Sequence, residues 1–154
     1  MKSFIRMQSP LGELELVADG GELLAISYRR GFAPDAVEKK TPVLKLAETQ
    51  LKEYFAGKRK SFDLPLKLAG TPFEAKVWRH LAAIPYGKVI TYGEVAKAIG
   101  NPKACRAVEM ANHRNKLPIV IPCHRVIGSG GKLTGYAGGL EIKEFLLKLE
   151  GSLN

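Results

Sequence analysis

The sequence predicts an α/β fold of the α+β type: a small antiparallel sheet with one helix, followed by a mostly helical domain that carries a helix-turn-helix and an accessible cysteine. Short, partly alternating apolar runs separated by Gly-containing turns occur in residues 1–28, which is typical of a β meander. Apolar residues at helical spacing recur in the later segments. A chain of 154 residues can form one domain, or two small ones, with a buried core.

The N-terminal domain is predicted to span residues 1–69 and to serve as a scaffold. Its expected strands, separated by turns that contain glycine, are residues 3–7, 13–18 and 23–28. Residues 44–55 have apolar side chains at helical spacing, and Gly57 is expected to end this helix.

The C-terminal domain is predicted to span residues 70–154. Its first helix is expected to begin at Thr71-Pro72, where a cap precedes a first-turn proline, and its apolar face continues to Ile84. A final amphipathic helix is expected over residues 140–149, with an inward face of Ile142, Phe145, Leu146 and Leu149.

Two short helices are predicted between these elements. Thr91 and Glu94 have capping-box spacing, and Gly100 is expected to end the first helix. Asn101-Pro102 should begin the second, which runs to about His113. The pattern fits a helix-turn-helix, and by itself it fits an ordinary helical hairpin equally well.

A cysteine follows the most apolar run of this domain. The β-branched residues from Pro118 to Ile121 predict a buried strand that stops at Pro122 and presents Cys123 at its end. His124 and Arg125 are residue types that lower a cysteine pKa or accept its proton, so the local chemistry favours a thiolate. The alternative is a buried cysteine that acts as a small hydrophobic residue. A later glycine-rich segment, residues 128–139, predicts either a wing or lid that approaches a ligand, or a flexible linker.

The charge of the chain favours a polyanionic partner. Lys and Arg number 24 against 15 acidic residues, which gives a formal net charge of +9. Residues 97–132 hold seven of these basic residues and one acid, Glu109. Two cysteines without a disulfide framework, and no signal or membrane-spanning segment, predict a cytoplasmic protein with access to the nucleoid and no membrane partner.

The segment Ile121-Pro122-Cys123-His124-Arg125-Val126 resembles the active-site signature of the alkylguanine-DNA alkyltransferases, also called methylated-DNA-protein-cysteine methyltransferases. The resemblance extends from about Pro72 to Gly151. It implies repair of double-stranded DNA by stoichiometric transfer of an alkyl group from O6-alkylguanine to Cys123. It also implies no cofactor, no metal and a monomeric protein.

The resemblance also assigns catalytic roles. Cys123 matches the nucleophile, His124 the base that acts through a water molecule, and Glu150 the glutamate that orients the histidine. Tyr92 matches a tyrosine that donates to the base edge. Asn115 matches an asparagine that holds the turn before the active site.

Further positions match the DNA contacts and the base pocket of the family. Arg106 corresponds to the finger residue that replaces the extrahelical base, because chemistry on a base requires it to leave the stack. The other expected DNA contacts are Lys103, Arg114 and Arg125. The residues expected to line the base pocket are Pro118, Tyr136, Ala137 and Gly138.

Three residues depart from the family pattern. Glu109 stands where glycine is usual, close to the face that the resemblance places in the minor groove. Ala137 replaces a common serine, and Lys116 replaces a common proline. A binding-only protein and a cysteine hydrolase are the alternative functions. The second cysteine, Cys105, is expected to be buried and inert.

Overall fold

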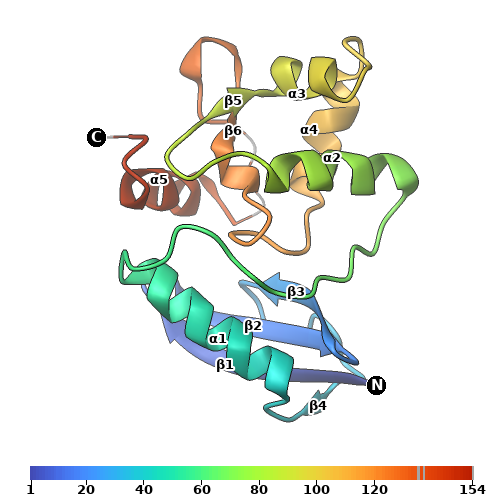
Figure 1. The fold of residues 1–154 in the computed structure, drawn as a ribbon, viewed down its shortest axis with the longest axis vertical. Coiled ribbons are helices and arrows are strands. Elements are labelled where there is room, and N and C mark those ends of the chain that lie inside the picture. The colour runs from blue at the N-terminus through green and yellow to red at the C-terminus, as the bar shows by residue number, and fades with distance from the viewer. Residues whose placement is uncertain (135, 137, 154) are drawn as a thin grey trace. The chain divides into compact units, whose positions relative to one another are not determined.

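The structure is a computed structural model that describes residues 1–134, 136 and 138–153. The chain divides into two compact units, Met1–Ala69 and Gly70–Asn154 (Figure 1). Among the described residues, no helix combines the length and the apolar character needed to cross a membrane.

The first unit is a four-stranded sheet with one helix. The strands β1 (Lys2–Ser9), β2 (Gly12–Asp19), β3 (Glu22–Ser27) and β4 (Val37–Glu38) lie in the order β3-β2-β1-β4. The pairs β1–β2 and β2–β3 are antiparallel, as the turn glycines predict. The short edge strand β4 is parallel to β1, so the predicted purely antiparallel sheet is wrong at this edge.

Helix α1 (Pro42–Phe55) lies against this sheet (Figure 1). It buries Leu44, Ala47, Leu51 and Tyr54, which lie on one face at the spacing that predicts the helix. Its buried polar residue, Gln50, accepts from the backbone N–H of Asp63 at 2.9 Å and donates to the carbonyl of the same residue at 3.0 Å. The segment that follows the helix is thereby fixed to it.

In its described residues the second unit contains four helices, two very short strands and two 3₁₀ turns. The helices are α2 (Pro72–Ala82), α3 (Tyr92–Ala98), α4 (Cys105–His113) and α5 (Leu140–Leu149). The strands β5 (Ile90–Thr91) and β6 (Val126–Ile127) pair in parallel, and the turns are η1 (Cys123–Arg125) and η2 (Ser129–Gly131).

Both predicted helix starts with a threonine cap are confirmed. The side chains of Thr71 and Thr91 each accept from the backbone N–H of the glutamate three residues later, and their own backbone N–H groups donate to the side chain of that glutamate, which completes a capping box. Gly70 is required before the first cap, because a Cβ atom there would lie 2.5 Å from the Trp78 ring. Trp78 in turn donates to the Ala111 carbonyl at 2.8 Å and ties α2 to α4.

The predicted start of the second short helix at Asn101-Pro102 is wrong by a few residues. Helix α4 begins at Cys105, and its N-cap is Ala104, whose N–H donates to the Asn101 carbonyl in a preceding turn. This turn takes up the residues that the sequence pattern places in the helix. The inward face predicted for α5 is also partly wrong. The buried residues of this helix are Lys143, Leu146 and Leu147, whereas Phe145 is exposed.

The strand predicted before Cys123 does not form. Residues 118–121 are a compact turn in which Ile119 has a φ of 76°, and the Ile121 N–H donates to the Leu117 carbonyl at 2.8 Å. The Asn115 side chain accepts from the Leu117 N–H at 3.0 Å and donates to the Ile121 carbonyl at 2.8 Å. Because this amide supplies backbone partners that a neighbouring strand would otherwise provide, the apolar run is buried without joining a sheet.

Candidate active site

Cys123 lies in η1 immediately after this turn, and its side chain is buried rather than exposed at a strand end. Burial raises the pKa of the thiol, whereas the Asn115 and Tyr136 side chains and the positive charge of Lys143 act in the opposite direction. The prediction that the local chemistry favours a resting thiolate is therefore wrong.

His124 follows the cysteine directly and pairs with Glu150. Its side chain is fully buried, and Nε2 lies 2.8 Å from Glu150 Oε2. A carboxylate only accepts, so Nε2 carries the proton and Nδ1 has the free lone pair. Nδ1 has no hydrogen-bond partner among the described residues. Burial lowers the pKa of His124 although Glu150 acts in the opposite direction, which keeps the ring neutral and able to accept a proton.

Arg125 was expected to contact DNA, and the structure places it inside the protein instead. Its Nε donates to Glu150 Oε1 at 2.8 Å and its Nη2 to Glu150 Oε2 at 3.0 Å. Its Nη1 donates to the Ile84 carbonyl at 2.6 Å. These bonds occupy the guanidinium, which is 5% exposed, and hold the Glu150 carboxylate that contacts His124.

Lys143 is a site residue that sequence reasoning missed. Its buried ammonium donates to the carbonyls of Val126 at 2.6 Å and Thr134 at 2.8 Å. Burial lowers its pKa to about 8, and the charges of Cys123 and Glu109 favour its protonated form. The sequence held one signal for the burial of Lys143: it lies one turn before Leu146 and Leu147, with which it shares the buried face of α5.

Tyr92 lies at the start of α3 and is buried. Its hydroxyl donates to the Thr134 carbonyl at 3.2 Å, which is the same carbonyl that Lys143 contacts. Burial raises the pKa of Tyr92, so the phenol remains a proton donor. The thiol, the phenol and the ammonium are therefore grouped in one part of the second unit.

The expected lining of the base pocket is described in part. Pro118 and Tyr136 are buried, and Gly138 is half-buried. Ala137 lies outside the described residues, so its departure from the family pattern has no structural description. Among the described residues, no group of three or more His, Cys, Asp or Glu side chains could hold a metal ion.

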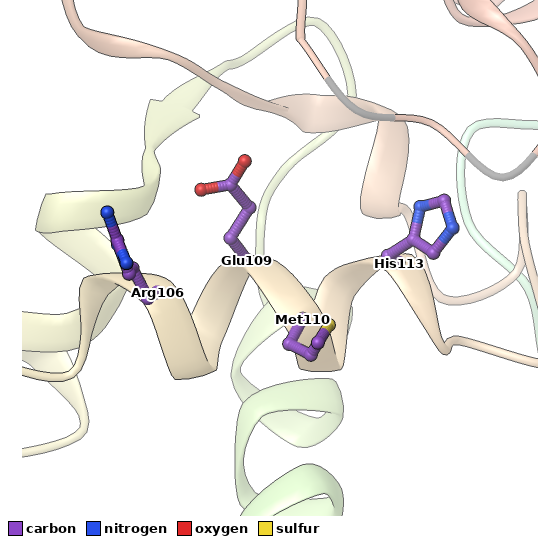
Figure 2. A pocket seen from close by; sticks show the side chains of 4 residues that line it. All are labelled: Arg106, Glu109, Met110 and His113. Carbon is purple, nitrogen blue, oxygen red and sulfur yellow. The ribbon is translucent and has the colours of Figure 1, made fainter.

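The exposed face of α4 carries the remaining candidates. Lys103, Arg106 and Arg114 are all exposed, and Arg114 lies 3.7 Å from Glu74 in a loose ion pair. A cavity of about 340 Å³ on this face is lined by Arg106, Glu109, Met110 and His113 (Figure 2). Cys105 is exposed, so the prediction that it is buried is wrong.

Comparisons with known proteins match both units. The family described as 6-O-methylguanine DNA methyltransferase, DNA binding domain, matches residues 72–152. The family described as 6-O-methylguanine DNA methyltransferase, ribonuclease-like domain, matches residues 4–68.

Relatives match over nearly the whole chain. A methylated-DNA-protein-cysteine methyltransferase of Methanosarcina acetivorans is 52% identical over 94% of this chain and 96% of its own length. The constitutive enzyme of Bacillus subtilis is 48% identical over 97% and 96%. The structure of Mycobacterium tuberculosis OGT in complex with DNA is 43% identical, with a TM-score of 0.90 over 97% of this chain and 93% of that one. The chain therefore belongs to the methylated-DNA-protein-cysteine methyltransferase family, which repairs alkylated DNA by direct transfer to a cysteine.

Proposed function

We propose that this DNA-repair methyltransferase accepts the alkyl group of O6-alkylguanine on Cys123 Sγ, once per chain. The observation that carries this assignment is the buried series Cys123, His124 and Glu150, in which the histidine presents a free Nδ1. A nucleophile, a base and an orienting carboxylate are the groups that covalent catalysis by a thiol requires.

The proposed reaction begins when His124 Nδ1 takes up the thiol proton through a bridging water molecule. Sγ then attacks the alkyl carbon, the S–C bond forms, and the bond between that carbon and guanine O6 breaks. Tyr92 donates toward the base, and the proton lost by the thiol is balanced by one gained by the departing guanine. The thioether has no easy leaving route, so each chain reacts once.

The duplex is proposed to contact the exposed face of α4. A base must leave the stack before such chemistry, and Arg106 is proposed to occupy the gap that it leaves. Lys103 and Arg114 are proposed to contact phosphates, which adds affinity without sequence preference. The unit of residues 1–69 is proposed to act as a scaffold, in a monomer located in the cytoplasm.

Mass spectrometry after incubation with a duplex that contains O6-methylguanine tests the assignment. We expect one added methyl group on Cys123, no adduct in Cys123→Ala, and retained DNA binding by that variant. Because Cys105 is exposed, Cys105→Ser is the matched control and should react like the unmodified protein. Methylation at Cys105 would contradict the assignment, and repeated turnover without an adduct would indicate a hydrolase.

A further inference from the structure

Glu109 is an isolated acid on a basic face. It is exposed on α4, and it is the single acid among seven basic residues in positions 97–132. Its side chain points to the same side of the helix as those of Arg106 and His113 (Figure 2). Among the described residues it has no hydrogen bond or ion pair of its own. Its carboxylate is therefore available to a ligand of α4.

The carboxylate also lies close to the reacting groups. Its charge favours the protonated forms of Tyr92 and Lys143, and both of these side chains donate to the Thr134 carbonyl. Glu109 and Arg106 line the same cavity. A residue so placed is within reach of the DNA around the alkylated base.

The spacing on α4 indicates which part of the DNA this is. Glu109 follows Arg106 by three residues, a rise of about 4.5 Å along the helix. Base pairs are stacked about 3.4 Å apart along each strand. If Arg106 occupies the place of the extruded base and α4 follows the groove, Glu109 lies about one base step away, beside the neighbouring base pair.

A carboxylate can only accept hydrogen bonds, and phosphates repel it. The base edges that suit it are amino groups. In the minor groove only guanine N2 offers one, and in the major groove cytosine N4 is the usual partner of Glu. We propose that Glu109 is a specificity-determining residue that favours a G·C pair beside the alkylated guanine. The inference rests on the function proposed above.

The test is single-turnover methyl transfer, with protein below saturation, on duplexes that differ only in the pair flanking O6-methylguanine. A G·C neighbour also makes base extrusion harder, so the informative quantity is the ratio of rates on G·C and A·T flanks, compared between proteins. We expect this ratio to fall about fivefold in Glu109→Ala, the lower range for one contact between a side chain and a base. Glu144→Gln removes a negative charge elsewhere, on α5, and should keep the original ratio.

Replacing the flanking guanine by inosine identifies the groove, because inosine lacks only the minor-groove amino group. Loss of the preference with inosine would place Glu109 in the minor groove, and its retention in the major groove. If Glu109→Ala accelerates transfer equally on every flank, the carboxylate only repels phosphates and the proposal is wrong. The proposed function is tested separately, since its failure would abolish methylation of Cys123 on all duplexes in all these proteins.

Discussion

His124 determines the pH dependence expected of the transfer. A histidine with an ordinary pKa near 6.5 would be half protonated at that pH and would lose half of its activity as a base. Burial lowers the pKa of His124, so the ring stays neutral below this value. We expect the transfer rate to be nearly unchanged between pH 7.5 and 6.5 and to fall only at lower pH. A pH profile of single-turnover rates checks this, and a midpoint at 6.5 or above would contradict it.

The same shift affects stability with a defined sign. At a pH between the lowered folded pKa of His124 and about 6.5, the unfolded chain binds more protons than the folded one. The contribution of His124 to the free energy of unfolding is therefore complete above pH 6.5 and decreases as the pH falls below it.

Lys143 is expected to assist ionisation of the thiol. In Lys143→Met the nearby positive charge is lost, so the pKa of Cys123 should rise further and transfer should slow by about tenfold for each pKa unit. Ultraviolet absorbance of the thiolate across a pH titration, together with transfer rates, measures both effects. Lys148→Met is the matched control, because Lys148 lies on the same helix and is half exposed. Equal thiol pKa values in the two variants would exclude the role.

The sequence was informative for some of these residues and not for others. Cys123 and His124 could be proposed from their motif because their chemistry is contained in the residue types, whereas Glu150 was assigned only through the family resemblance. Lys143 and Arg125 could not be placed in this way, since charged side chains are usually exposed. Their burial depends on partners distant in the chain: the carbonyls of Val126, Thr134 and Ile84, and the Glu150 carboxylate.

Helix α4 is the element that carries the proposed contacts to duplex DNA. Removal of the Arg106 side chain should slow transfer from a duplex and leave transfer from the free alkylated base nearly unchanged, because only the duplex requires the gap to be filled. Parallel rate measurements on the two substrates test this for Arg106→Ala. Equal losses on both would show that Arg106 acts on the site itself and not on the extruded state.

The turn over residues 117–121 depends on one amide. Asn115→Ala leaves the buried Leu117 N–H without a partner, while the Ile121 carbonyl keeps the Cys123 N–H at 2.7 Å, so the variant should lose about 1 to 3 kcal/mol of unfolding free energy. Denaturant unfolding measures the change. Asn101→Ala is the control, because Asn101 is exposed and contributes its backbone carbonyl to the turn before α4. A similar small loss in both variants would contradict the assigned role of the amide.

This turn also explains why the elements were predicted unevenly. The capping boxes of Thr71 and Thr91 are local, so their spacing alone identified the starts of α2 and α3. Strand formation is not local, because β-branched residues form a strand only beside a partner. Residues 118–121 have the composition of a strand, but the Asn115 side chain provides backbone hydrogen bonds at both ends of this segment that a neighbouring strand would otherwise provide.

At the scale of the whole molecule, the protein alkylated on Cys123 should be less stable than the unreacted protein. Cys123 is 4% exposed, and an added alkyl group in a close-packed interior costs on the order of 1 to 3 kcal/mol. Alkylation also replaces the thiol proton of Cys123, so the sulfur can no longer exchange a proton with His124. Thermal unfolding of the unmodified, methylated and benzylated protein should give successively lower midpoints. An unchanged or rising midpoint across the series would show that the site accommodates the adduct without strain.

The buried bonds of Glu150 join the cysteine motif to a residue 25 to 27 positions later in the chain. A ribosome makes the chain from its N-terminus, so Cys123 and His124 are synthesised before the carboxylate that orients the base. The nascent chain therefore cannot complete its catalytic network until residue 150 has emerged. We therefore expect a chain that lacks residue 150 to transfer the alkyl group more slowly than the complete protein.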